Sequence, residues 1–340
     1  MSSRAFITGV SGLELSAAER EFIRGERPWG FILFKRNVET PDQVSALVQE
    51  LRNCVGAADA PVLIDQEGGR VARLGPPHWP VYPPGATFGA LYDHELELGL
   101  QAARLSSRLI AADLNDLGIN VDCLPLADVP IAGADAVIGN RAYGTEPAKV
   151  AAIARAVTEG LEQGGVLPVL KHIPGHGRAT ADSHFRLPTV DTPREELERT
   201  DFAAFRPLAD LPMAMTAHVV FSALDPAQPA TTSATIIRQV IRGEIGFQGL
   251  LMSDDVSMNA LAGSIAERTR AIVQAGCDMV LHCNGKLDEM RDVARETPRL
   301  TGEALQRARR ALASRKPPEP LDRLAARAEL DALLDRIGTA

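Results

Sequence analysis

Short apolar runs alternate with longer amphipathic segments along nearly the whole chain. Most of the runs are rich in Val, Ile and Leu and have the length of buried parallel strands, which are apolar on both faces. We expect eight such strands, at Ala5–Val10, Gly30–Phe34, Pro61–Ile64, Ile119–Val121, Val166–Leu170, Met213–Thr216, Leu250–Met252 and Met279–His282. The segments between them place apolar residues at helical spacing, so a helix is predicted after nearly every strand.

Several helix starts carry recognisable signals. Ser16 followed by Glu19 has the spacing of a capping box, and Thr40 stands at the entry of a helix over Pro41–Cys54. Further helices are expected over about 95–117, 147–163, 234–242 and 265–276, from about residue 193, and in two stretches after the eighth strand. The Pro-rich stretch Gly75–Thr87 is expected to be irregular.

Eight strand-then-helix units predict an α/β fold of the (β/α)8 TIM-barrel type, built as a single domain over residues 1–316. A doubly wound sheet is the alternative, but the chain has neither a GxGxxG nor a GxxxxGK[ST] phosphate-binding pattern. The Pro-rich break Lys316–Pro320 precedes one last helix, which is too short for a second domain. We therefore expect residues 317–340 to be a helical extension that packs on the barrel.

Ionisable residues recur where the expected strands end. They are Asp65 after the third strand, Asp122 and Asp128 after the fourth, Lys171 and His172 after the fifth, His218 after the sixth, Asp254 and Asp255 after the seventh, and His282 at the end of the eighth. In TIM barrels the carboxyl ends of the strands surround the active site. This placement predicts a common cleft that binds a polar substrate.

The segment Lys171–His184 reads KHIPGHGRATADSH and is the most concentrated group of reactive residue types. In an extended backbone Asp182 and His184 would point to the same side, and a carboxylate next to a histidine fixes its tautomer and raises its basicity. The pair could therefore transfer protons near neutral pH. His176 occupies a loop position, and we read it as a structural residue.

A carboxylate nucleophile and a proton donor on either side of a scissile bond are the groups that retaining glycoside hydrolysis requires. Asp254 or Asp255 could supply the first and His184 the second. Strand alternation alone does not choose between the two aspartates.

Composition and charge exclude some classes of binding partner. The formal net charge is -8, so nothing supplies the basic surface that nucleic acids or anionic membranes need. No stretch approaches the roughly 18 apolar residues of a membrane span, and the amino terminus lacks a signal-peptide pattern. Four cysteines without a CxxC pair indicate reduced thiols. We expect a cytoplasmic protein without cofactor or metal, and we take a monomer as the working expectation.

Six motifs, taken together and at their intervals, resemble the β-N-acetylglucosaminidases of glycoside hydrolase family 3. They are GFILFKRNV, IDQEGGRVARL, VIGNRAYG, KHIPGHGRATADSH, MTAHVVFSALD and LLMSDDVSM, and the similarity runs from about Ala5 to Cys283. The resemblance implies a TIM barrel that removes non-reducing terminal N-acetylglucosamine with retention, through a covalent glycosyl-enzyme. In the similar bacterial members the substrate is the cytoplasmic N-acetylglucosaminyl-1,6-anhydro-muropeptide of cell-wall recycling, so a small saccharide or muropeptide is the implied partner.

The resemblance also implies roles for individual residues. Asp254 matches the nucleophile, His184 the acid/base and Asp182 the residue paired with it. The positions that bind the sugar hydroxyls and the acetamido group are matched by Asp65, Arg73, Arg141, Lys171 and His172. Glucosidases of the family take their acid/base carboxylate from a later domain, so the Asp-x-His loop indicates the N-acetylglucosamine branch.

Three alternatives stay open. A metal-dependent hydrolase would use His172, His176, His184 and Asp182 as ligands, although the first strand lacks the His-x-His of such barrels. A silent sugar-binding barrel would bind saccharide without turnover. A phosphorylase would use the same site, because a histidine acid/base does not repel a phosphate dianion as a carboxylate would.

Overall fold

The computed structural model describes residues 3–183 and 186–338. Its centre is a parallel sheet in the order β7-β6-β3-β2-β1-β13-β12-β10-β8. The strands are β1 (Arg4–Thr8), β2 (Pro28–Leu33), β3 (Val62–Ile64), β6 (Val121–Asp122), β7 (Leu167–Pro168), β8 (Leu170–Ile173), β10 (Met213–Thr216), β12 (Leu250–Asp255) and β13 (Met279–His282).

The two ends of this sheet belong to one continuous segment of chain. β7 pairs with β6 and β8 pairs with β10, while only Val169 separates β7 from β8. The sheet therefore closes into a barrel, and β7 with β8 corresponds to the single fifth strand expected from the sequence. That strand runs further than expected, because Lys171 and His172 lie within β8. The predicted single-domain barrel is confirmed.

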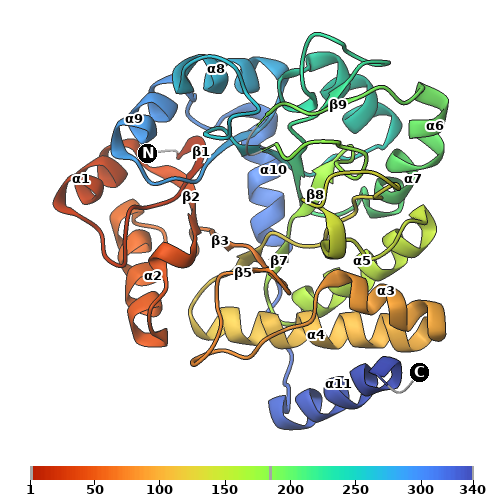
Figure 1. Ribbon diagram of the computed structural model, residues 1–340. Helices are drawn as coiled ribbons and strands as arrows, with labels where there is room; N and C mark the ends of the chain where they lie inside the picture. The colour runs from red at the N-terminus through yellow and green to blue at the C-terminus, as the bar shows by residue number, and fades with distance from the viewer. Residues whose placement is uncertain (1–2, 184–185, 339–340) are drawn as a thin grey trace.

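Helices surround the barrel (Figure 1). They are α1 (Ala17–Glu26), α2 (Pro41–Val55), α3 (Gly85–His94), α4 (Leu96–Asp116), α5 (Pro147–Gln163), α6 (Arg194–Arg199), α7 (Asp201–Phe205), α8 (Ile265–Ala275), α9 (Leu287–Glu296), α10 (Gly302–Ala313) and α11 (Arg323–Gly338). Residues Ile236–Glu244 form a π-helical segment where a helix was expected. The predicted capping box is confirmed, since the Ser16 hydroxyl accepts from the Glu19 amide and the Glu19 carboxylate accepts from the Ser16 amide.

Alternation along the strands produces two apolar layers. In β1, Ala5 and Ile7 belong to the cluster inside the barrel, whereas Phe6 belongs to the larger cluster between strands and helices. Both layers exclude water, so the apolar runs read from the sequence are accounted for by burial on both faces. The closed barrel holds its strand ends rigidly around one polar opening.

Several short elements were not expected from the sequence. The third strand is followed by an antiparallel hairpin, β4 (Gln66–Gly68) and β5 (Val71–Ala72), and β9 (Thr189–Val190) pairs with β11 (Val220–Phe221). Strands of two or three residues are too short to show a period. The irregular stretch is also shorter than predicted, because α3 begins at Gly85. A Cβ on Gly85 would lie 2.1 Å from the Arg141 carbonyl oxygen, so this helix start needs glycine.

The last helix, α11, lies alongside α4 (Figure 1). Arg323 makes two bonds to the Asp116 carboxylate, at 2.6 and 2.8 Å, and Gln101 bonds to Glu329. The division at residue 316 stays a prediction. In the part of the chain that the structure describes, no helix is both long and apolar enough to cross a membrane.

Candidate active site

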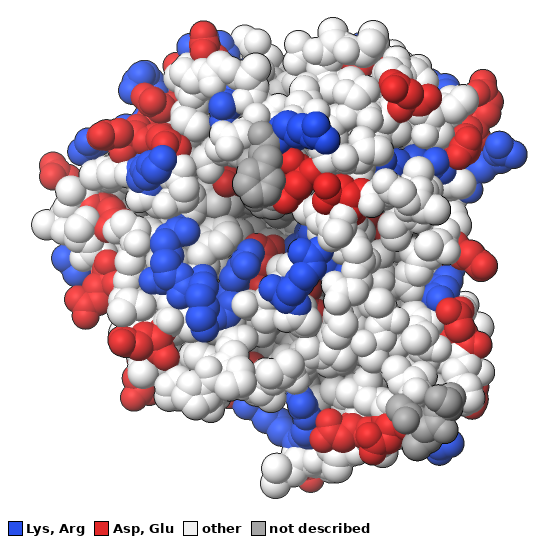
Figure 2. All heavy atoms as spheres, viewed as in Figure 1, with Lys and Arg blue, Asp and Glu red and all other residues white. Residues whose placement is uncertain are grey.

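A pocket of about 270 Å³ opens where the barrel strands end. Figure 2 shows the hollow with acidic groups deep inside it and basic side chains beside it. Its lining includes seven of the eight residues singled out from the sequence: Asp65, Arg73, Arg141, Lys171, His172, Asp182 and Asp254. The eighth, His184, lies outside the described residues. Segments far apart in the chain thus contribute to one site, as the strand-end pattern predicted.

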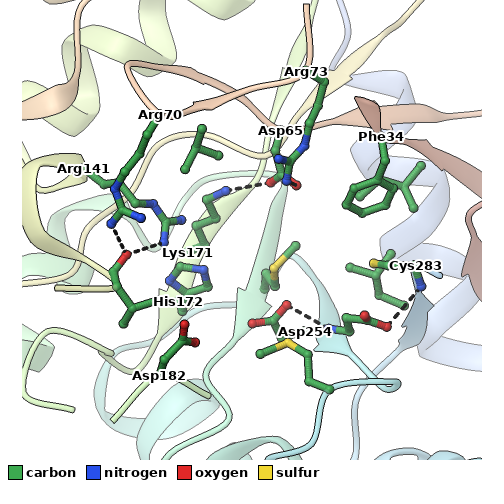
Figure 3. A pocket seen from close by; sticks show the side chains of 17 residues that line it. Phe34, Asp65, Arg70, Arg73, Arg141, Lys171, His172, Asp182, Asp254 and Cys283 are labelled. Carbon is green, nitrogen blue, oxygen red and sulfur yellow. Dashed lines mark hydrogen bonds and ion pairs between the residues drawn. The ribbon is translucent and has the colours of Figure 1, made fainter. Parts of the chain in front are cut away.

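One wall of the pocket belongs to a chain of alternating charges, in which Asp65, Arg73, Arg141 and Lys171 line the pocket and Glu67 does not. The Lys171 ammonium lies 2.9 Å from Asp65 Oδ1 and 2.6 Å from Glu67 Oε1. Arg73 donates to the other oxygen of Asp65 at 3.0 Å, and Arg141 makes a two-bond contact with Glu67 at 2.7 and 2.8 Å. Each carboxylate therefore lies between two cations, and all five side chains are fixed before a substrate arrives. Figure 3 shows the contacts of Asp65 with Lys171 and Arg73.

This arrangement determines the protonation of the wall. Burial alone would raise the pKa of both carboxyl groups, but the neighbouring cations outweigh it. They hold the pKa of Asp65 well below its usual range and lower that of Glu67 to about 2, while the two carboxylates raise the pKa of Lys171. Nearby Asp122 has no cation within such contact, and burial raises its pKa well above the usual value. The wall is ionised at neutral pH, whereas burial favours the protonated form of Asp122.

Asp128 orients His172, the residue that follows Lys171 in β8. Its buried carboxylate accepts from His172 Nδ1 at 2.7 Å and from the backbone amides of His172 and His176 at 3.3 and 2.7 Å. Burial opposes ionisation, but the two histidines and these bonds lower the pKa of Asp128. An ionised carboxylate can only accept, so the proton between the two groups belongs to Nδ1 of His172. The other ring nitrogen is then the one available on the pocket side.

The structure distinguishes the two adjacent aspartates of β12. The Asp255 carboxylate accepts from the Ser257 amide and hydroxyl, at 3.0 and 2.6 Å, and from the Cys283 amide at 3.1 Å. It therefore joins the ends of β12 and β13. The Asp254 carboxylate accepts from the Asp255 amide at 2.8 Å and faces the pocket on the side where Asp182 lies (Figure 3). Asp254 is the better placed of the two to reach a bound sugar.

Two further histidines, His218 and His282, do not line the pocket. His218 contacts the Thr231 hydroxyl through Nδ1 at 2.7 Å and the Asp255 carbonyl through Nε2 at 3.0 Å. Because a carbonyl only accepts, Nε2 carries the proton, and burial lowers the pKa of this ring. His218 thus supports the backbone beside Asp254. His282 is fully buried, and burial likewise lowers its pKa.

Sequence reasoning missed two residues of the site and gave a third, Asp128, no role of its own. Glu67 and Arg70 lie on the unexpected β4–β5 hairpin, and Arg70 donates to the carbonyls of Ala136 and Val137 at 2.7 and 2.6 Å. Asp128 was noted only as a polar residue after a strand. A signal for Glu67 was present, because it is two residues beyond Asp65 and an extended chain places such side chains on one side.

Among residues 3–183 and 186–338, no group of three or more His, Cys, Asp or Glu side chains could hold a metal ion. One of the four ligands of the metal-dependent alternative, His184, lies outside these residues. Within the described part, the His172 nitrogen is directed to Asp128 and His176 bonds to Ser183.

Comparison with known proteins identifies the family of the chain. Residues 7–313 match the glycosyl hydrolase family 3 N-terminal domain. A beta-hexosaminidase of Alkalilimnicola ehrlichii is 39% identical over 280 residues, which cover 81% of this chain and 79% of that protein.

Two solved structures of NagZ from Neisseria gonorrhoeae, each 29% identical, share the fold. The zinc complex has a TM-score of 0.87 and covers 98% of this chain and 99% of its own. The complex with N-trifluoroacetyl-D-glucosamine has a TM-score of 0.85 and covers 99% and 98%. The family match extends over nearly the whole barrel and the sequence identity over four fifths of the chain. This chain is therefore a glycoside hydrolase and belongs to glycosyl hydrolase family 3.

Proposed function

We propose that the protein is a retaining β-N-acetylglucosaminidase that removes terminal N-acetylglucosamine through a covalent glycosyl-enzyme on Asp254. His184 acts as acid/base, and Asp182 orients it. The observation that carries the proposal is the pocket itself. Asp254 and Asp182 line one end of it, and a preformed wall of ionised hydrogen-bonding groups occupies the other (Figure 3).

The pocket suits a single sugar ring. Its volume of about 270 Å³ lies just below the range of about 300–1,000 Å³ for drug-sized ligands. The Asp65 carboxylate can accept from adjacent hydroxyls, while Arg73 and Lys171 donate to ring substituents. Arg141 and His172 lie beside them, where they can bind the acetamido group. These partners are ionised and fixed before binding, so little ordering is needed when the sugar enters.

The reaction proceeds in two displacements. Asp254 attacks the anomeric carbon, the bond to the glycosidic oxygen breaks, and that oxygen takes a proton from His184. In the second step His184 accepts a proton from water, the water oxygen attacks the anomeric carbon, and the Asp254 ester is cleaved. A neighbouring Asp182 favours the cationic imidazole that donates in the first step.

The natural substrate that we propose is the N-acetylglucosaminyl-1,6-anhydro-muropeptide of peptidoglycan recycling, hydrolysed in the cytoplasm by a monomeric enzyme. Its leaving group carries carboxylates. Beside the pocket mouth lies a basic rim, which we define as Lys35, Arg70 and Arg73. Arg73 also stacks on Phe34, with 5.1 Å between the guanidinium carbon and the ring centroid. This rim would favour an anionic leaving group over the neutral one of a chitin fragment.

Lys35→Gln should lower kcat/KM for the muropeptide about two- to fivefold, the effect of an exposed charge worth ~0.5–1 kcal/mol. Turnover of neutral chitobiose should not change, because its leaving group has no charge to attract. Steady-state kinetics with both substrates measures this, and added salt should reduce the difference. Lys316→Gln is the matched control, since Lys316 is also exposed and lies beside Asp59 and Asn120. These two residues precede β3 and β6, so Lys316 is at the other end of the strands from the pocket. Equal losses for both substrates would remove the rim from substrate selection.

Release of nitrophenol from 4-nitrophenyl N-acetyl-β-glucosaminide tests the main proposal. We expect turnover that is unaffected by a chelator and gives N-acetylglucosamine with retained configuration. Loss of activity on chelation would favour the metal-dependent hydrolase. The chelator is included because the Neisseria gonorrhoeae relative has been solved as a zinc complex. N-acetylglucosamine-1-phosphate as the main product in phosphate buffer would indicate a phosphorylase. A folded protein that binds N-acetylglucosamine but hydrolyses neither the nitrophenyl substrate nor the muropeptide would indicate a silent sugar-binding barrel.

A further inference from the structure

The loop that follows β8 is attached to its surroundings along its first half. The His176 amide donates to Asp128 at 2.7 Å. Arg178 is buried and pairs with Asp201 at 2.6 Å and with Glu196 at 2.9 Å. The Ala179 carbonyl accepts from the backbone amide of residue 135 at 2.8 Å. These contacts fix the loop up to residue 179, four positions before Ser183.

Ser183 attaches the second half of the loop at two points. It is only 3% exposed, and its hydroxyl lies 3.1 Å from His176 Nε2. Its carbonyl accepts from the Ala260 amide at 3.2 Å. Ala260 belongs to the segment that follows β12, six residues after Asp254. One buried serine therefore joins the loop that carries Asp182 to the segment that follows the strand of Asp254.

The direction of the His176–Ser183 bond follows from burial. Burial lowers the pKa of His176 to about 4, helped by nearby His172, so the ring is neutral at physiological pH. Nδ1 of this ring is buried and has no hydrogen-bond partner among the described residues. A buried N–H without a partner costs more than a bare ring nitrogen, so the proton belongs on Nε2. His176 then donates to the Ser183 hydroxyl oxygen.

We propose that Ser183, held by His176 and by the Ala260 amide, is a positioning residue that sets where Asp182 lies relative to Asp254. Asp182 is joined to Ser183 by one peptide bond, so its carboxylate moves with the serine. Glycoside hydrolysis with retention needs its acid/base group and its nucleophile at a fixed separation across the scissile bond. A displacement of about 1 Å can cost as much as a hundredfold in rate. The inference rests on the proposed function, in which Asp182 orients the acid/base.

The test compares leaving groups. kcat/KM reports the first step, in which a phenolate leaving group needs a proton and 2,4-dinitrophenolate does not. Ser183→Ala should lower kcat/KM about ten- to a hundredfold for phenyl N-acetyl-β-glucosaminide. The change for the 2,4-dinitrophenyl substrate should stay below about threefold, because Asp254 is untouched. A role limited to stability would lower both values equally.

Variants of the donor complete the design. His176→Gln keeps an amide donor near the position of Nε2. It should therefore retain much of the kcat/KM for the phenyl substrate that His176→Leu loses. Ser183→Ala and His176→Leu remove the same hydrogen bond. The double variant should therefore lose less kcat/KM for the phenyl substrate than the two single losses multiplied together. Ser222→Ala is a matched serine control outside the pocket, where the hydroxyl makes only a 3.4 Å contact with the Val190 carbonyl.

The outcomes separate the two hypotheses. Wild-type protein that hydrolyses neither aryl substrate would contradict the proposed function. Wild-type turnover with equal losses for both leaving groups, or with no loss in Ser183→Ala, would overturn the positioning role and leave the glycosidase assignment in place.

Discussion

Asp254→Asn should lower turnover of 4-nitrophenyl N-acetyl-β-glucosaminide by several orders of magnitude while the protein stays folded. The amide is a poor nucleophile, so no glycosyl-enzyme forms and the barrier of the direct reaction returns. Folding should be retained because the asparagine carbonyl can still accept from the Asp255 amide, as the carboxylate does at 2.8 Å. Initial rates together with thermal unfolding measure both expectations.

Asp255→Asn is the matched comparison, since it makes the same change one residue away. Its oxygen can still accept from the amides of Ser257 and Cys283, so the junction of β12 and β13 survives. We expect activity within about tenfold of the wild type, because the altered group does not react. If Asp255→Asn were the inactive variant and Asp254→Asn the active one, the nucleophile assignment would be reversed.

Chemical rescue extends this test to stereochemistry. Asp254→Gly leaves room for azide on the face from which the carboxylate attacks. Added azide should restore turnover of the dinitrophenyl substrate and give the α-glycosyl azide, the product of one inverting displacement. A β-glycosyl azide, or rescue in Asp255→Gly alone, would contradict attack by Asp254.

The barrel was predictable because its strands carry a local signal. Each is an apolar run bounded by polar or glycine-rich sequence, and the order of strands and helices follows the chain. Closure itself also follows, since eight parallel strands with right-handed helical crossovers have few other arrangements. Placing Asp65, Lys171 and Asp254 at strand ends was then enough to predict that they share a cleft, which the pocket confirms.

The missing parts depend on contacts between distant segments. Glu67 is held by Arg141, 74 residues away, and Asp128 by the histidines 44 and 48 residues beyond it. No period or spacing in the sequence shows such partners. The choice between Asp254 and Asp255 was hidden for the same reason, because it depends on a bond between Asp255 and Cys283 in the neighbouring strand. Local sequence patterns predict which strands and helices form. Which polar side chains bind one another, and which stay available to the substrate, is decided only when the closed barrel brings distant segments together.

Glu67→Gln should destabilise the protein strongly at neutral pH. The Glu67 side chain is 5% exposed and is the only carboxylate among the described residues that contacts both Lys171 and Arg141. Removing one partner of a buried charge network costs about 3–5 kcal/mol, because the opposite charges remain buried. The direction is the same as that of its pKa, which the cations lower from 4.5 to about 2. Urea unfolding at pH 7 measures the difference from the wild type.

The sign of the pH dependence follows from the same shift. The folded-state pKa of Glu67 lies below its unfolded value, so its ionisation stabilises the native state fully above about pH 5. That contribution is lost as the pH falls from 4.5 towards 2. The variant lacks the titrating group, so the gap between wild type and Glu67→Gln should narrow on acidification.

Glu303→Gln provides the control for a charge pair at the surface. Glu303 pairs with Arg307, but its side chain is 79% exposed, so the loss should stay within about 1 kcal/mol and vary little with pH. Glu67→Gln should also lower kcat/KM about tenfold or more, since Lys171 and Arg141 lose the partner that holds them towards the sugar. A fully stable Glu67→Gln variant with unchanged kcat/KM would show that Asp65 alone suffices to organise these cations. The charge-alternating wall would then be an incidental feature of the pocket and not the device that prepares it for substrate.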